Sequence, residues 1–209
     1  MSENDASFSG YNRHEVPKFL EGYFLISEVE LMDPNFYRTV VLLVKHDEEG
    51  AFGLVVNRRS NVTLGELVDG FEASEARELP IHVGGPVQQE FLFALHSGFP
   101  DQLQSEHAST PTDGVVFEPV TESVVEYLKN EWVNIPKESR PRIHLFAGYS
   151  GWGAGQLEGE LKEQAWVILP ASSDIVFYPN PAEGWRQALS RKGAFYKIVA
   201  ETGFKPSMN

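Results

Sequence analysis

The chain has 209 residues, a length that one hydrophobic core can organise, so we expect a single domain. Seventeen Lys and Arg residues against 30 Asp and Glu residues give a formal net charge of −13, which disfavours direct binding to nucleic acid. The absence of cysteine excludes disulfides, thiolate metal sites and a cysteine nucleophile. Hydrophobic residues make up 42% of the chain, which is ordinary for a folded globular protein.

The first 16 residues are polar and aperiodic, and we interpret them as a flexible tail before one folded domain at residues 17–209. The start, Met1–Asp5, is acidic and lacks the basic and apolar regions of a secretory signal. The longest aliphatic run, Val40–Val44, is far too short to span a membrane. We therefore expect a cytoplasmic protein without membrane association.

The N-terminal part of the domain is predicted to form strands, the first at Tyr23–Ser27. The apolar runs Phe36–Lys45 and Ala51–Asn57 flank the charged segment His46–Gly50, which predicts a β-hairpin. His46 is expected at the solvated tip of this hairpin. Because both runs are continuously apolar, we expect both faces of the hairpin to be covered.

Thr63 and Glu66 have the spacing of a capping box and predict a short helix. We expect this helix to bury Leu64, Leu67 and Val68.

The middle of the chain is predicted to contain strands at Ile81–Gly84 and Phe91–His96. Pro100–Gly114 is polar and contains two prolines, which predicts a flexible loop. Pro119–Trp132 is predicted as an amphipathic helix, because residues 124, 128 and 132 form one apolar stripe.

The C-terminal part is predicted to contain two strands and three helices. One helix has Asn180 as its cap and Pro181 in its first turn, and it ends at Gly193. Because strands come first and helices cluster later, the pattern favours an α+β fold. The remaining elements are strands at Ile143–Ala147 and Trp166–Leu169, a helix at Leu157–Ala165, and a last helix at Ala194–Glu201 that docks through Phe195, Ile198 and Val199.

A glycine-rich stretch, Ala147–Gln156, lies between a predicted strand and a predicted helix. One interpretation is a cradle of free backbone amides that binds phosphate or carboxylate. The other, which we favour, is a tight turn closely crossed by another backbone, with Trp152 filling the core. The stretch matches neither the P-loop nor the dinucleotide-binding pattern. Its candidate ligand-binding residues are Gly148, Tyr149, Gly151, Trp152, Gly153, Gly155 and Gln156.

Two further segments contribute candidate ligand-binding residues. Gly84, Gly85 and Pro86 follow a strand and predict a tight turn with glycine at positive φ. Asn57 and Arg58 end a buried strand, which would place the Arg58 guanidinium at the mouth of a cleft.

No catalytic residue, metal ligand or cofactor is predicted. Ser150 nearly matches the nucleophile elbow G-x-S-x-G, but Trp152 replaces the second glycine. Its partner would be His82, His96 or His144, which we interpret more simply as half-buried strand residues bonded to carbonyls. The spacing of the six histidines does not fit a metal site.

Five ordered segments within about residues 19–200 carry a resemblance to a known family. They are Gly22–Ile26, Met32–Phe36, Gly50–Arg58, Gly84–Val87 and Gly148–Glu158. Together they resemble the AlgH/YqgE family of small bacterial proteins. In that family alanine is usual at the position of Ser150, which argues against a catalytic serine.

The resemblance implies a single α+β domain whose strongly bent mixed or antiparallel sheet forms a pseudo-barrel with packed helices. It implies no established enzymatic activity. The family name refers to a transcriptional regulator, but the sequence contains no DNA-binding motif. We expect a non-catalytic binding or regulatory module whose partner is a protein or a small molecule. The alternatives are an enzyme that binds a phosphorylated or acyl substrate at the glycine-rich stretch, and a DNA-linked regulator.

Overall fold

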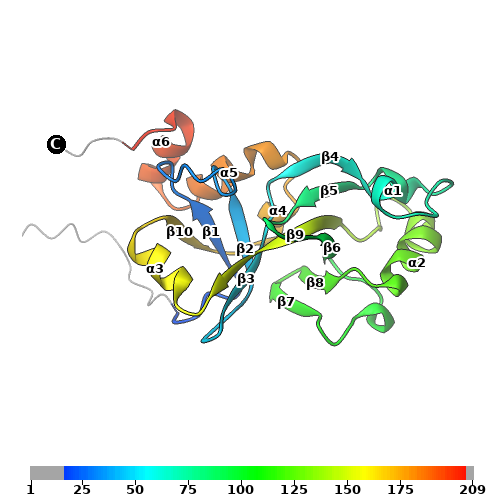
Figure 1. Ribbon diagram of the computed structural model, residues 1–209. Coiled ribbons are helices and arrows are strands. Elements are labelled where there is room, and N and C mark those ends of the chain that lie inside the picture. Colours follow the sequence, from blue (N-terminus) through cyan, green and yellow to red (C-terminus); the bar gives the residue numbers. More distant parts are fainter. Residues whose placement is uncertain (1–16, 206–209) are drawn as a thin grey trace, which may run out of the picture.

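The computed structural model describes residues 17–205, so the predicted tail at residues 1–16 lies outside the described residues. In this range ten strands form one strongly curled sheet (Figure 1). Its order is β10-β1-β2-β3-β9-β6-β8-β7, and β5 and β4 branch from β9. The strands are β1 (Tyr23–Ser27), β2 (Val40–Asp47), β3 (Gly50–Val55), β4 (Arg59–Thr63), β5 (Pro80–Val83), β6 (Val87–His96), β7 (Ser109–Thr112), β8 (Val115–Pro119), β9 (Ile143–Gly153) and β10 (Trp166–Pro170).

The long strand β9 joins the two parts of the sheet. Its first half pairs in parallel with β5 and antiparallel with β6, whereas its second half pairs antiparallel with β3. Gly148 lies between the halves at a φ of 69°, a conformation that glycine adopts without steric cost. The strand therefore bends there and carries the sheet into a half-barrel.

Contacts between β7 and the other end of the sheet nearly close the barrel. The Thr112 hydroxyl donates to the Ala171 carbonyl at 3.0 Å. A Cβ on Gly22 would lie 2.3 Å from the carbonyl oxygen of Pro111, so the two backbones touch. The α+β class and the single-domain pseudo-barrel implied by the resemblance are confirmed.

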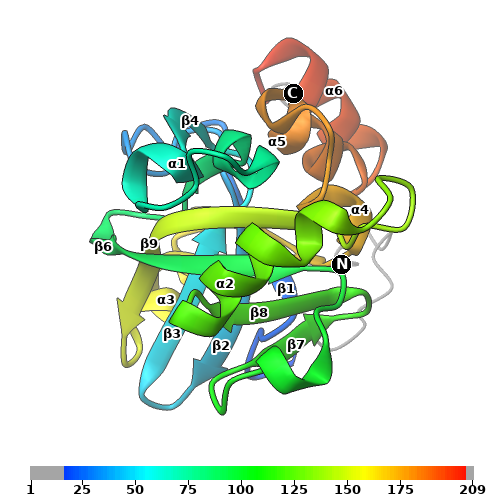
Figure 2. The same cartoon turned by 90° about the vertical axis from the view of Figure 1, so that its right-hand side faces the viewer.

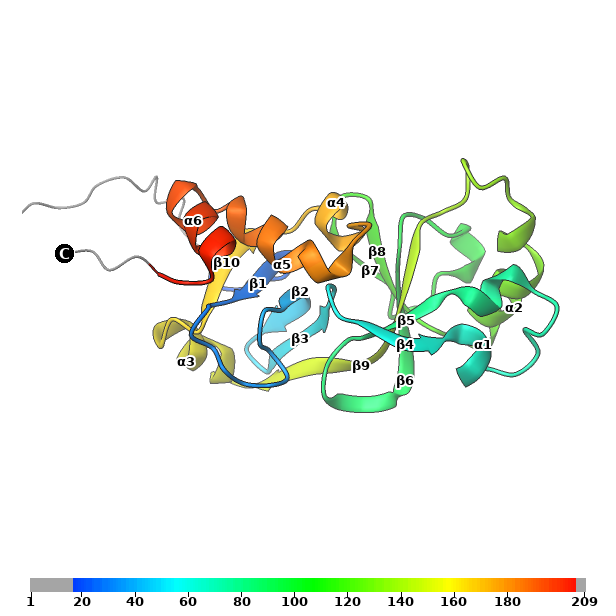
Figure 3. The ribbon, with the colours of Figure 1, turned by 90° about the horizontal axis from the view of Figure 1, so that it is seen from above.

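The helices pack at different places around this sheet (Figures 2 and 3). Helices α4 to α6 lie over the β1–β3 part of the sheet, and α1 and α2 lie at the far side, near β4 and β5 (Figure 3). Among residues 17–205, each helix falls short of the length and apolar character that a membrane crossing requires. The helices are α1 (Leu64–Leu67), α2 (Glu122–Asn130), α3 (Gln156–Lys162), α4 (Ser173–Val176), α5 (Pro181–Ser190) and α6 (Ala194–Thr202).

The apolar side chains form three buried clusters. The largest fills the barrel interior and includes Leu42 and Leu54, and a second lies beneath α1 and α2. The third lies on the other face of β2, where Val41 and Leu43 pack with Trp152. Both faces of the predicted β2–β3 hairpin are therefore covered, as its continuous apolar runs indicate.

Several predicted elements need correction. The predicted loop Pro100–Gly114 contains the strand β7, which pairs with β8. The sequence pattern revealed neither strand. The polar residues of β7 hide it, because its pairing partner rather than its own pattern makes it a strand. Helix α2 begins only at Glu122, but Val124 and Leu128 of its predicted stripe are buried.

The predicted burial is wrong for three residues expected in the core and for one expected at the surface. Leu67, Phe195 and Ile198 are exposed, because α1 has a single turn and α6 packs through Val199 instead. His46 is buried rather than solvated at the hairpin tip. Its Nδ1 accepts the Leu20 N–H at 2.9 Å, and its Nε2 lies 3.2 Å from Glu158 Oε1.

Candidate functional site

The glycine-rich stretch is not a loop, because residues 148–153 continue β9. Gly53 is paired with Ser150, and Gly50 with Gly153, across the antiparallel β3–β9 ladder. Helix α3 starts only at Gln156 and has seven residues. The backbone of the stretch thus belongs largely to a sheet, and the loop geometry expected for an amide cradle is absent from this described segment.

The turn that contains Gly84 and Gly85 crosses close to the backbone of β9, which explains why glycine occupies both positions. A Cβ on Gly84 would lie 2.2 Å from the Gly148 carbonyl oxygen, and a Cβ on Gly85 would lie 2.2 Å from that of Tyr149. The predicted positive φ at Gly84 or Gly85 is wrong, since the positive φ after this turn belongs to Gln88 at 48°. The glycine-rich stretch is thus closely crossed by another backbone, as the structural interpretation that we favoured predicts.

The other residues of the stretch have different surroundings. Trp152 is buried in the third cluster, and its Nε1 donates to Glu160 at 2.9 Å. A Cβ on Gly153 or Gly155 would meet nothing within 4 Å. Gln156 accepts the Gly153 N–H at 3.1 Å and so links the end of β9 to α3.

Asn57 and Arg58 brace the backbone at a distance from the stretch. Asn57 Oδ1 accepts the Val40 N–H at 2.7 Å, and its Nδ2 donates to the Arg38 carbonyl at 2.9 Å. Asn57 also packs against Gly184 of α5. Arg58 donates to the Asn35 carbonyl at 2.8 Å. The structure does not bring these two residues together with Tyr149 and Trp152.

Ser150 is fully buried and donates its hydroxyl to the Gly84 carbonyl at 3.2 Å. The histidines weighed as its partners lie in ring stacks of their own. His82 stacks on His144 with ring centroids 4.5 Å apart, and His96 stacks on Phe99 at 3.7 Å. Among the described residues, the contacts of Ser150 and of these histidines therefore do not include the serine–histidine pair that the sequence analysis weighed and disfavoured.

Burial keeps all three histidines neutral at pH 7. Desolvation lowers the pKa of His82 and His96 to about 4, and it lowers the pKa of His144 to about 3. His82 Nδ1 lies 3.3 Å from the Leu145 carbonyl, as predicted. His96 differs from the prediction, because neither ring nitrogen has a hydrogen-bond partner. Among residues 17–205, no three acidic or histidine side chains gather as metal ligands would.

Three aromatic rings gather around Phe52. Phe52 contacts Tyr149 with ring centroids 4.7 Å apart, and it contacts Phe93 and Phe117 at 5.6 and 5.5 Å. These rings belong to β3, β6, β8 and β9. We call the four residues Phe52, Phe93, Phe117 and Tyr149 the barrel mouth.

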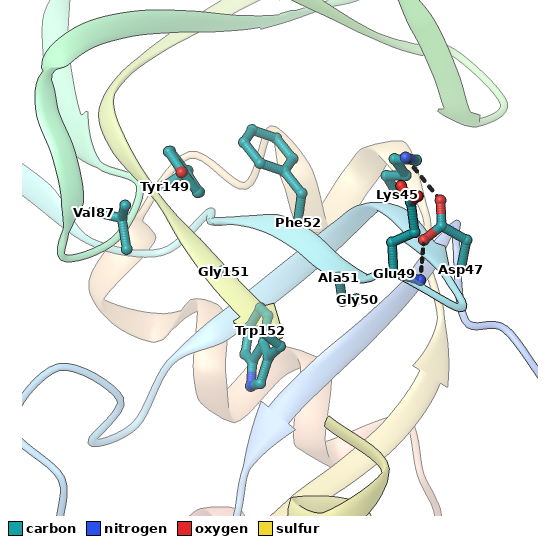
Figure 4. A pocket seen from close by; sticks show the side chains of 10 residues that line it. All are labelled: Lys45, Asp47, Glu49, Gly50, Ala51, Phe52, Val87, Tyr149, Gly151 and Trp152. Atoms are coloured by element: carbon teal, nitrogen blue, oxygen red, sulfur yellow. Dashed lines mark hydrogen bonds and ion pairs between the residues drawn. The ribbon is translucent and has the colours of Figure 1, made fainter. Parts of the chain in front are cut away.

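Two cavities flank the barrel mouth and share Lys45 and Phe52. The first has a volume of about 460 Å³ and the second about 420 Å³. The first is lined by Lys45, Asp47, Glu49, Gly50, Ala51, Phe52, Val87, Tyr149, Gly151 and Trp152 (Figure 4). The second is lined by Glu21, Val44, Lys45, Phe52, Phe93, His107, Ser109, Phe117 and Pro119.

Side-chain direction separates the candidate residues on β9. Phe52 and Tyr149 project from the same side of the sheet, whereas Trp152 points to the opposite side (Figure 4). Of the predicted ligand-binding residues, Tyr149, Gly151 and Trp152 line the first cavity. Only Tyr149 contributes its side chain to the barrel mouth.

The polar rim of the first cavity is charged. Lys45 Nζ lies 2.7 Å from Asp47 Oδ2, and the Glu49 N–H donates to Asp47 Oδ1 at 2.9 Å (Figure 4). These bonds lower the pKa of Asp47, mainly through Lys45. The pKa of Lys45 is raised, first by Asp47 and further by the charges of Glu49 and Glu21. Lys45 and Asp47 are therefore both ionised at neutral pH.

Sequence reasoning missed most of the cavity lining. Phe52, Phe93 and Phe117 look like ordinary core residues, because strand patterns do not indicate which end of a barrel stays uncovered. The one local signal was Tyr149, an aromatic residue next to a glycine bend.

Comparisons with known proteins place the chain in a family. The family model described as AlgH-like matches residues 24–197. A UPF0301 protein of Chlorobium limicola is 36% identical over 196 residues, covering 94% of this chain and 99% of the relative. A UPF0301 protein of Thioalkalivibrio sulfidiphilus is 33% identical and covers 85% of this chain and 91% of the relative.

Two solved structures are similar to the whole barrel. The solution structure of the AlgH protein from Pseudomonas aeruginosa matches with a TM-score of 0.70 and 32% identity, covering 88% of this chain and 94% of that one. A crystal structure from Corynebacterium diphtheriae matches with a TM-score of 0.68 at 20% identity, covering 91% and 96%, and shows the fold alone. The chain thus belongs to the AlgH-like family of bacterial proteins, also called UPF0301.

Proposed function

We propose that this protein is a non-catalytic, cytoplasmic binding module that holds the apolar part of a small ligand in its barrel mouth. The observation that carries this proposal is the pair of cavities around four aromatic rings, of which Phe52, Phe93 and Tyr149 are only partly buried. Mouths of β-barrels are frequent ligand sites, and cavities of a few hundred Å³ suit small molecules. Any regulatory role would then act through this ligand.

A buried hydroxyl in the second cavity supports the proposal. Ser109 Oγ is shielded from solvent and has no hydrogen-bond partner among the described residues. Buried polar atoms are almost always hydrogen-bonded, so this oxygen can accommodate a water molecule or a polar ligand atom as its partner. A polar atom on a largely apolar ligand would satisfy it.

The protonation states at the rim support binding without catalysis. A general acid or base works best when its pKa lies near the operating pH. The pKa values of Asp47 and Lys45 are shifted away from neutral pH, since that of Asp47 is lowered and that of Lys45 is raised. These groups suit electrostatic recognition better than proton transfer.

Ser109→Leu tests the proposal by filling the second cavity. The neutral probe 4-ethylphenol is titrated into ¹⁵N-labelled protein, and amide shifts are expected at Phe52 and Phe117, which line the second cavity. Ser109→Leu is expected to abolish them without destabilising the fold, because it also removes an unsatisfied hydroxyl.

The matched control is Thr110→Leu, the next residue on β7, which is exposed. It is expected to leave the titration unchanged. Wild-type protein that shows no saturable shifts at the mouth, or equal loss in both variants, would refute the proposed site.

A further inference from the structure

The rim of the barrel mouth carries more negative than positive charge. Three carboxylates, those of Glu21, Asp47 and Glu49, all act on the Lys45 ammonium group. Glu21, Asp47 and Glu49 also line the cavities themselves. One ammonium among three carboxylates leaves a local excess of two negative charges.

Only one of these carboxylates is neutralised by a direct contact. Asp47 forms the 2.7 Å ion pair with Lys45, whereas among the described residues Glu21 and Glu49 form no direct ion pair and are attracted to Lys45 only at longer range. The neighbouring Glu48 differs, since it pairs with Lys18 at 2.9 Å and lines neither cavity. The unneutralised charge is thus concentrated where a ligand would enter.

The rings beside these carboxylates favour the same ligand charge. The face of an aromatic ring attracts a cation, and Phe52 and Tyr149 project from the same side of the sheet and both line the first cavity (Figure 4). An anionic ligand would meet repulsion from the rim and from the overall charge of −13.

We infer that the barrel mouth binds a small organic ammonium ion with an aromatic or aliphatic body, a specificity that rests on the proposed function. The body packs among the four rings, and the ammonium group lies at the rim between Glu21 and Glu49. The cavity volumes of about 460 and 420 Å³ fit a small molecule rather than a polypeptide segment.

Two probes of nearly equal shape test this inference, 2-phenylethylammonium and neutral 2-phenylethanol. Their dissociation constants for the full chain are compared by calorimetry and by amide shifts at the mouth. We expect the ammonium ion to bind about fivefold more tightly at low salt, since exposed charge pairs contribute modestly and are screened. High salt is expected to reduce this preference.

Substitutions at the rim are expected to act in opposite directions. The double variant Glu21→Gln/Glu49→Gln should abolish the preference for the ammonium ion and leave 2-phenylethanol binding unchanged. Lys45→Gln should increase the preference, because it removes the competing cation. Glu48→Gln is the matched control and should have no effect.

Each result distinguishes this inference from the proposed function. Equal binding of the two probes, or tighter binding of anionic 3-phenylpropionate, would overturn the charge specificity and leave the apolar site intact. Failure of both probes to bind would overturn the site itself. Tighter binding of the peptide acetyl-Lys-Phe-Lys-amide than of the amine would overturn the small-ligand assignment in favour of a partner chain.

Discussion

The two ends of the barrel share one apolar interior, but helices cover one end and leave the other partly open. At one end α4 and α5 insert Ile175, Val176 and Trp185, each no more than 2% exposed. At the other end Phe52 and Tyr149 belong to the same cluster, yet they are only partly buried and border open cavities. We call the first the sealed end.

The contrast shows what covering an apolar surface contributes. Burying a large side chain stabilises a fold by a few kcal/mol, so the sealed end is where the barrel obtains rigidity. The mouth forgoes part of that stabilisation. Partly exposed aromatic surface of this kind often marks a binding site.

The largest expected effect is acid destabilisation that originates away from the mouth. The folded-state pKa of His82 and of His96 is about 4, against an ordinary value of 6.5. The unfolded chain therefore binds more protons between these values, and the stability is complete above about pH 6.5 and is lost as the pH falls toward 4. Together with His144 the loss amounts to roughly several kcal/mol, measurable by urea unfolding across this pH range.

Two variants identify the source of this acid response. His96→Leu should reduce the pH dependence, leaving the part due to His82 and His144, without lowering stability at pH 7, because it removes a buried ring with unpartnered nitrogens. His107→Gln alters an exposed histidine of the second cavity and should leave the curve unchanged. A wild-type stability that is flat from pH 7 to pH 4 would contradict the prediction.

Truncating an aromatic ring should cost more at the sealed end than at the mouth. Trp185 is 2% exposed and its Nε1 donates to the Ser27 carbonyl at 2.9 Å, so Trp185→Ala should cost about 3–5 kcal/mol. Phe52→Ala should cost about 1–2 kcal/mol, because the ring is only partly buried. The free energies of unfolding in urea check both values, and equal costs would abolish the distinction between the two ends.

Substitutions at two glycines near β9 should also differ in their cost to stability, because one glycine is tightly packed and the other is not. Gly84→Ala places a Cβ 2.2 Å from a backbone oxygen and should cost about 1–3 kcal/mol or more. Gly153→Ala meets nothing within 4 Å and should change stability by less than about 0.5 kcal/mol. Thermal unfolding of the two variants measures this difference. If Gly84→Ala leaves the stability unchanged, the backbone crossing between Gly84 and β9 is not tightly packed.

The smallest effect is expected for the ion pair at the rim. Lys45 and Asp47 are both exposed or nearly so, and water screens their attraction. Asp47→Asn should therefore leave the unfolding midpoint unchanged while reducing ammonium binding. A clear loss of stability in this variant would mean that the rim supports the fold, and the calorimetric titration would then have to be corrected for unfolding.

The elements that local pattern predicted correctly are those whose signals lie within a few residues. Tyr23–Ser27 is β1 as predicted, and the β2–β3 hairpin follows from two apolar runs around a charged turn. Helix α5 starts at Pro181 and stops before Gly193, as the residues at its ends indicate. The cap is an exception in detail, since the Asn180 side chain forms no capping bond.

The errors have a common cause in partners that lie far away in the sequence. Ser150–Gly153 is part of a strand because β3 pairs with it, and Ser109–Thr112 is a strand because β8 does. His46 is buried because Leu20 and Glu158 reach it from other elements. Local composition does not encode such contacts.

The amino-acid sequence alone was sufficient for the class of fold, the family resemblance and the exclusion of cysteine chemistry, because composition and short motifs carry that information. The barrel mouth required the folded chain. Its rings come from β3, β6, β8 and β9, and its charges come from β2, from the β2–β3 turn and from the segment before β1. Curling of the sheet through β9 brings them together, and the absence of a covering helix at that end, among the described residues, leaves them open.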